Sequence, residues 1–176
     1  MVDNVSAAYE ATKHLIDNGC KRIAFLAGPT NVTVSNQRQT GYENALKGSG
    51  LNIDETLIVH GSYDLQQVIE LTNYLIDLQN PPDGLVVVSD RLAIGAMSAF
   101  RARNINVPND IAIVSFNDEP ICTIVTPTLT SVWQPTMEMG RMAMSLLINQ
   151  IEKEGSPAEV KVFKTGLKIR ESSKRK

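Results

Sequence analysis

Residues 83–118, DGLVVVSDRLAIGAMSAFRARNINVPNDIAIVSFND, decide the fold that the rest of the sequence completes. They hold two short, unbroken apolar runs, Leu85–Val88 and Ile111–Val114, which flank a stretch with apolar residues at roughly helical spacing. Apolar runs without alternation are typical of strands buried on both faces of a parallel sheet. The segment therefore predicts a β–α–β crossover, which is expected to be right-handed.

Polar residues stand at the ends of both apolar runs. Ser89 and Asp90 follow the first run, and Asn117 and Asp118 follow the second. In open α/β sheets, ligands bind beyond the carboxyl ends of the strands. We therefore expect the ligand site at these strand ends. A plain helix cap is the alternative for Ser89 and Asp90, because both are cap-type residues.

The rest of the chain continues the alternation of helix and strand. Further helices are expected from Asn4 or Ser6, either of which can supply the cap, to Asn18, and at 35–48, 64–78 and 136–154. Further strands are expected at 23–27, 57–60 and 129–133, with an alternating edge strand at 159–164 and a basic tail at 168–176. This order predicts an α/β fold with a doubly wound, mostly parallel sheet.

Composition narrows the class of protein. The 176 residues are enough for one domain with a sizeable core, and a net charge of −2 without a basic face argues against direct nucleic-acid binding by this chain. No apolar run has membrane-spanning length and no signal peptide is recognisable, so a cytoplasmic location is expected. Cys20 and Cys122 are expected to be free buried thiols, and neither a metal nor a cofactor is predicted.

Several phrases of the sequence, in their order along the chain, resemble one known family. They are VDN at 2–4, HLIDNGCKRIAFLAGP at 14–29, R-x-x-G-Y at 38–42, the central segment from Ser89, TPTLTSVWQP at 126–135, the Met-Gly-Arg start of a helix and IRESS at 169–173. Together they resemble the effector-binding region of transcription regulators of the lactose-repressor/galactose-repressor (LacI/GalR) family, which has a periplasmic-binding-protein-like fold.

The resemblance implies that the chain is a partial effector-binding domain. Residues 4–132 and 159–173 would form one complete lobe, whereas residues 133–158 would be a crossover and a helix of the other lobe. A helix-turn-helix headpiece and most of that other lobe would precede the chain. Met139, Met142, Leu146 or Leu147 is then expected to collapse onto the present lobe or to pack on a neighbouring chain.

The resemblance also implies a set of effector-binding residues between the two lobes. The set is Asp3, Arg38, Tyr63, Ser89, Asp90, Asn117 and Gln134. Arg38 would donate its planar fork to ligand oxygens and Tyr63 would stack on the ligand. A solvated helix position for Arg38 and a mere loop aromatic for Tyr63 are the alternatives. The family often has Asp-Asp where this chain has Asn117-Asp118, so that contact could move to Asp118.

A two-fold dimer interface is the second site that the resemblance implies. Its apolar centre would be Ile94, Met97, Ile124 and Val125. Packing of Ile94 and Met97 on the sheet alone is the alternative. An exposed apolar patch would favour dimerisation.

The resemblance therefore favours a role as the effector-sensing and dimerisation domain of a transcription regulator. We expect this regulator to be a repressor. Its effector would be a small polar metabolite, and a sugar is the class that we expect. DNA would be bound only through the headpiece. One rival is the sugar-binding protein of an uptake system, which shares the fold. An enzyme is the other rival, but G-x-G-x-x-G, a P-loop and G-x-S-x-G are all missing from the sequence.

Overall fold

A computed structural model describes residues 1–152 and 159–175 of the chain. Its helices are α1 (Asn4–Asp17), α2 (Thr33–Gly48), α3 (Leu65–Ile76), α4 (Asp90–Ala102) and α5 (Thr136–Glu152). Its strands are β1 (Ile23–Ala27), β2 (Ile58–His60), β3 (Gly84–Val87), β4 (Ala112–Asn117), β5 (Thr130–Trp133) and β6 (Gly166–Lys168). The expected end of the last helix, at residues 153–154, lies outside the described residues.

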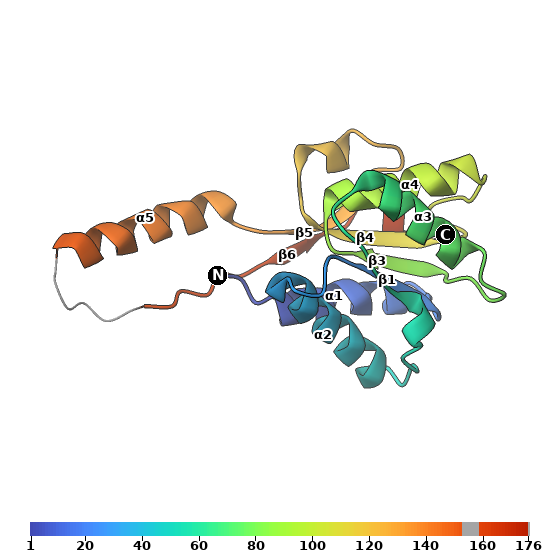
Figure 1. Cartoon of the computed structure of the whole chain (residues 1–176), viewed down its shortest axis with the longest axis horizontal. Coiled ribbons are helices and arrows are strands. Elements are labelled where there is room, and N and C mark those ends of the chain that lie inside the picture. Colours follow the sequence, from blue (N-terminus) through green and yellow to red (C-terminus); the bar gives the residue numbers. More distant parts are fainter. Residues whose placement is uncertain (153–158, 176) are drawn as a thin grey trace.

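The strands form one sheet in the order β2-β1-β3-β4-β5-β6, with β6 antiparallel to β5 and all other pairs parallel. Helices α1 and α2 cover one face and α3 and α4 cover the other (Figure 1). Every residue of β1 and β3 is buried, as their unbroken apolar runs predict. The doubly wound α/β fold is confirmed.

The edge strand predicted at Glu159–Lys164 is wrong. Residues 159–165 form no strand, although Phe163 makes an isolated bridge to Val2, and the strand that pairs with β5 begins at Gly166. Val160 and Val162 alternate with polar residues but are exposed. The apolar side chains of this alternating segment therefore do not pack on the sheet, whereas Leu167 packs against its core.

The basic tail is in part docked, because residues 170–173 lie against the sheet. Ser172 and Ser173 are fully buried, and the Ser172 Oγ donates to the Ile113 carbonyl at 2.8 Å. The Ser173 Oγ lies 2.7 Å from the Thr130 Oγ1 and 2.8 Å from the His14 Nε2. Short hydroxyl side chains fit this role because they satisfy buried polar groups with little volume.

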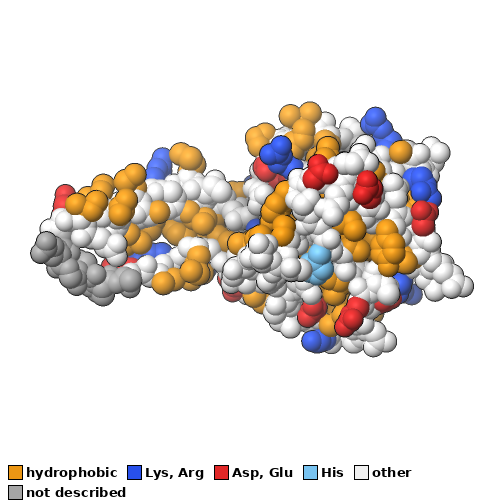
Figure 2. All heavy atoms as spheres, viewed as in Figure 1, with side chains coloured by type: hydrophobic (Ala, Val, Ile, Leu, Met, Phe, Trp, Pro, Cys, Tyr) orange, Lys and Arg blue, Asp and Glu red, His pale blue; other side chains and the backbone are white. Residues whose placement is uncertain are grey.

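Helix α5 does not collapse onto the lobe. It extends away from the sheet (Figure 1), and no residue of Thr136–Glu152 is buried. Met139, Met142 and Leu146 are half-buried and Leu147 is exposed. Hydrophobic side chains are visible along this projecting part of the molecule in Figure 2. Packing of this helix on another chain stays a prediction.

Helices α1 and α2 approach each other most closely at Gly41. A Cβ at this position would overlap the carbonyl oxygen of Val5 and lie 2.8 Å from the Cβ of Ala8. Gly41→Ala is expected to force the helices apart and to lower the free energy of unfolding by about 1–3 kcal/mol in urea denaturation. Gly140→Ala is the matched control, since nothing lies within 4 Å of its added Cβ. Equal effects of the two substitutions would contradict the close approach.

Candidate functional site

The carboxyl ends of β1, β3, β4 and β5 lie at the same end of the sheet, because these strands are parallel. Each strand is followed by residues with polar or aromatic side chains, and these include most of the sequence-predicted effector site. The strands β1 and β3 and all of β4 except Asn117 are buried, so their side chains are not open to a ligand along their length. The contacts of Arg38 show how the predicted residues are arranged there.

Arg38 is the centre of the arrangement. Its side chain is only 5% exposed, and its Nε donates to the Asn4 Oδ1 at 3.2 Å while its Nη1 donates to the Val88 carbonyl. The guanidinium lies over the ring of Phe116, 4.2 Å from the centroid. Burial lowers the pKa of Arg38 to about 10, so the group is still charged at neutral pH. The solvated-helix alternative for Arg38 is therefore wrong.

The partners of Arg38 are the chain neighbours of three other predicted residues. Asn4 follows Asp3, Val88 precedes Ser89, and Phe116 precedes Asn117. A single buried side chain from α2 thus connects the start of α1 with the ends of β3 and β4. The contacts leave the Arg38 Nη2 without a hydrogen-bond partner among the described residues, so its donors are available to a ligand.

Asn117 and Gln134 meet directly. The Gln134 Nε2 donates to the Asn117 Oδ1 at 2.9 Å, and both side chains are half-buried. Trp133, the neighbour of Gln134, stands opposite Asn117 in the pairing of β4 with β5 and is exposed. Trp133 is missing from the predicted site, although its place at the end of an apolar run, next to a predicted ligand residue, could have indicated it.

Tyr63 lies at the end of β1. Its side chain is 57% exposed, and a Cβ at Gly28 would lie 2.9 Å from its hydroxyl oxygen. The tyrosine therefore covers the turn that leaves β1, and only a glycine at position 28 leaves it room. Tyr63 and Trp133 give the site two exposed aromatic rings at its strand ends.

Asp90 faces inward. It is 0% exposed, and its carboxylate accepts hydrogen bonds from the hydroxyls of Ser115 and Ser131 and from the amide of Glu119. Ser89 is the N-cap residue of α4, but its side chain makes no capping bond, and it is half-buried. In this structure Ser89 is the member of the pair that a ligand can reach.

Asp3 is the N-cap of α1, in place of the expected Asn4 or Ser6. Its carboxylate accepts from the Ser6 amide at 2.9 Å and from the Ser6 hydroxyl at 2.6 Å. Both hydrogen bonds lower the pKa of Asp3, and the bond from the Ser6 hydroxyl has the larger effect. Asp3 is exposed and also lines a groove that the sequence did not predict.

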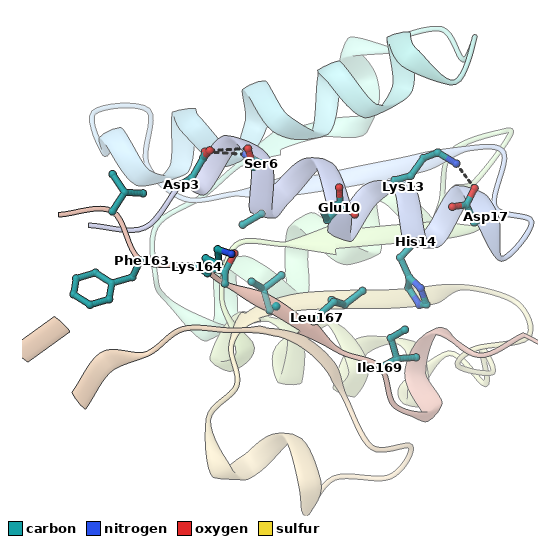
Figure 3. A pocket seen from close by; sticks show the side chains of 15 residues that line it. Asp3, Ser6, Glu10, Lys13, His14, Asp17, Phe163, Lys164, Leu167 and Ile169 are labelled. Carbon is teal, nitrogen blue, oxygen red and sulfur yellow. Dashed lines mark hydrogen bonds and ion pairs between the residues drawn. The ribbon is translucent and has the colours of Figure 1, made fainter. Parts of the chain in front are cut away.

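That groove, of about 750 Å³, lies between α1 and the chain through β6. Figure 3 shows His14 and Glu10 on its α1 wall and Leu167 and Ile169 on the opposite wall. Burial lowers the pKa of His14, and the carboxylate of Asp17 opposes this shift. Asp3 is the only sequence-predicted site residue among those that line it, so this groove is separate from the strand ends.

Asp118 has a partner that the sequence did not reveal. Its carboxylate forms an ion pair with the Arg170 Nη2 at 2.6 Å, and both side chains are largely buried. Arg170 also donates to the Leu129 carbonyl at 2.7 Å. Since Asp118 is neutralised by Arg170, it brings no free negative charge to the site.

The predicted dimer residues come together in a second groove. Ile94, Met97, Ile124 and Val125 all line this groove of about 610 Å³ beside α4. Ile124 is 73% exposed, whereas Met97 is buried and packs in the core. Ile94 and Met97 both pack against the core and also line the groove, and the dimer interface stays a prediction.

Cys20 and Cys122 are free and buried, and burial raises both thiol pKa values. Across residues 1–152 and 159–175, no group of His, Cys, Asp or Glu side chains is arranged to hold a metal ion. No helix in the same ranges is long and apolar enough to cross a membrane.

The sequence matches the family of periplasmic binding protein-like domains over residues 12–173. The catabolite control protein A of Priestia megaterium is 34% identical over 174 residues, which are 98% of this chain and 52% of that protein. The transcriptional repressor CytR of Escherichia coli K12 is 32% identical over 98% of this chain and 51% of its own length. The chain thus spans about half the length of these curated relatives.

A solved structure described as a transcriptional regulator CelR–cellobiose complex is similar in fold. It superposes with a TM-score of 0.92 at 34% identity over 97% of this chain and 52% of that chain. A structure of the transcription regulator CcpA of Lactococcus lactis superposes with a TM-score of 0.90 at 34% identity. The superposed region is 98% of this chain and 63% of the CcpA chain.

Arg38 is expected to contribute little net stability, because burial penalises its charge and its hydrogen-bond partners are neutral. Arg38→Met removes the desolvation penalty together with two hydrogen bonds, and it should change the free energy of unfolding by less than about 1 kcal/mol in urea. Phe116→Ala, which removes the ring beneath the guanidinium, should cost about 3–5 kcal/mol. A loss for Arg38→Met as large as that for Phe116→Ala would contradict this account.

Proposed function

The chain belongs to the family of periplasmic binding protein-like domains found in LacI-type transcription regulators, and from that membership we propose that it senses a small effector molecule. The effector binds at the carboxyl ends of the strands and alters DNA affinity through another part of the polypeptide. CytR is named as a transcriptional repressor, and the solved structures of CelR and of the Lactococcus lactis CcpA are named as transcription regulators, which favours this proposal over an uptake protein. The proposal assigns no catalytic reaction to the chain.

The observation that carries the proposal is the state of Arg38. A guanidinium that is 5% exposed, still charged and held by neutral acceptors has been positioned at a cost in free energy. Such a group is pre-organised to donate from its free edge to oxygen atoms. Ser89, Asn117 and Gln134 add neutral hydrogen-bonding groups around it, and Tyr63 and Trp133 add rings on which a ligand can stack.

This combination suits an uncharged, hydroxyl-rich molecule. Asp118 and Arg170 neutralise each other, so neither adds a free charge to the strand ends. A phosphate dianion would call for more positive charge than one guanidinium supplies. We therefore propose a neutral sugar as the effector, with cellobiose as the first probe because it is named in the complex of a structural relative.

We propose that the rest of the polypeptide supplies a second lobe against α5. Met137, Met144 and Ile151 lie seven residues apart along α5, Leu147 lies between the last two at helical spacing, and all four are exposed. Such a stripe normally packs on another element. Residues 1–3, 133–135 and 159–165 would be the crossovers, and the bridge between Val2 and Phe163 holds two of them side by side.

We propose that a helix-turn-helix headpiece in the rest of the polypeptide binds DNA and that the regulator is cytoplasmic. The full name of CytR carries the prefix "HTH-type", which stands for helix-turn-helix. The net charge of −2 on this chain agrees with a sensing role rather than direct contact with DNA.

The effector proposal is tested on the protein from the complete reading frame by isothermal titration calorimetry. Cellobiose, glucose, glucose 6-phosphate and hypoxanthine are the probes. We expect a neutral sugar to bind and Tyr63→Ala to weaken binding about tenfold or more through lost stacking. Tyr74→Ala on α3 is the matched control, because Tyr74 is similarly exposed, at 48% against 57% for Tyr63. Binding of only the phosphate or the purine would contradict the neutral-sugar proposal.

We also propose that two copies associate through the groove that contains Ile124. Ile124→Asp is expected to weaken a dimer of this chain at least tenfold in sedimentation equilibrium, because the introduced charge would be buried at the interface. Ile151→Asp on α5 is the matched control, since Ile151 and Ile124 are both 73% exposed. Dissociation by Ile151→Asp alone would place the contact on α5 and contradict the proposal.

A further inference from the structure

The exit from β4 has a backbone conformation that its residues do not favour. Asn117 has a φ of 110° and Asp118 a φ of 55°, two consecutive non-glycine residues in the left-handed region. Asparagine and aspartate tolerate this region better than most residues, but the conformation is still unfavourable for an L side chain. Something in the surrounding structure must therefore hold it.

The buried carboxylate of Asp90 lies directly behind this turn. One oxygen, Oδ2, accepts from the amide of Glu119 at 2.8 Å, immediately after the two left-handed residues. The other, Oδ1, accepts from the Ser131 Oγ at 2.6 Å and from the Ser115 Oγ at 2.5 Å. All its partners are donors, as an ionised carboxylate requires.

Ser131 carries the contact to the other side of the turn. Its Oγ, which donates to Asp90, also accepts from the amide of Asp118 at 3.0 Å. Asp90 thus holds the Glu119 amide directly and the Asp118 amide through one hydroxyl. The Asp118 amide lies between the two left-handed residues and the Glu119 amide directly follows them, so the carboxylate is placed to keep Asn117 in its orientation.

The orientation of Asn117 matters at the candidate site. Its Oδ1 accepts from Gln134, and its backbone pairs with Trp133 in the sheet. A relaxed turn would move the Asn117 amide away from Gln134 and change the surroundings of the Trp133 ring. Asp90 itself is 0% exposed and cannot touch a ligand without a rearrangement.

We propose that Asp90 is a positioning residue of the ligand site, whose buried carboxylate holds the turn 117–119 so that Asn117 faces the effector. The role as part of a ligand site rests on the proposed function, whereas the control of the turn does not. Asp90 therefore sets effector affinity from behind the site, through Ser131 and the Glu119 amide.

Asp90→Asn is the decisive variant because it changes one oxygen to an NH₂ group of nearly the same size. Its remaining oxygen can still accept from the two serines, but the NH₂ group would meet the Glu119 amide donor to donor. We expect the melting temperature to fall by about 3–10 °C and the fluorescence of Trp133, the only tryptophan, to shift without any ligand present.

Asp83→Asn is the matched control. The Asp83 carboxylate also accepts backbone amides, those of Lys21 and Arg22, but at the opposite end of the sheet. We expect this variant to lower the melting temperature and to leave the Trp133 emission unchanged. A similar emission shift in both variants would show general loosening of the lobe and overturn the proposal.

Asn117→Gly supplies the rescue. Glycine adopts a positive φ at little cost, so the carboxylate should matter less once the strain is removed. The fall in melting temperature on Asp90→Asn is expected to be at least halved in the Asn117→Gly background. An equal fall in both backgrounds would show that Asp90 does not hold the turn. Since none of these measurements uses an effector, their failure is distinct from a failure of sugar binding.

Discussion

The structure depends on parallel strands that are covered by helices on both faces. Because β1 and β3 are buried at every residue, no polar side chain along them can reach solvent. Solvent-accessible polar side chains therefore lie at the strand ends, and because the strands are parallel, their carboxyl ends lie together at one end of the sheet. The site is thus a consequence of how the core is made. Arg38 is the exception that enters from a helix, and its guanidinium requires an aromatic face and two neutral acceptors to remain there.

The sequence was most informative where the apolar pattern and the fold depend on the same residues. The unbroken run Ile23–Ala27 became β1 with the expected bounds, since each of its residues packs between two helix layers. Ser89 and Asn117 were located by the same reasoning, because a polar residue after a buried run must stand at a strand end. The resemblance to the LacI/GalR family added Arg38 and Gln134, which no periodicity identifies.

What the sequence could not supply is the direction in which a polar side chain points. Asp90 follows a strand just as Ser89 does, yet its carboxylate turns inward because Ser115 and Ser131 from two neighbouring strands meet it there. Those partners are distant in sequence. The alternation at Glu159–Lys164 misled for a related reason, because Val160 and Val162 are exposed and lie outside the sheet. An alternation of apolar and polar residues indicates that one side of a segment is covered, but it does not identify the element that covers it.

The docking of residues 170–173 has a consequence for biosynthesis. The bond between His14 and Ser173 joins positions 159 apart, and Ser172 satisfies groups on two central strands. During translation at about 5–20 residues per second, α1 therefore leaves the ribosome roughly 8–30 s before the residues that complete its face of the sheet. The edge of β5 likewise stays open until β6, only a few residues earlier in the chain, has been synthesised. The order of synthesis and the order of packing are thus opposed in this chain.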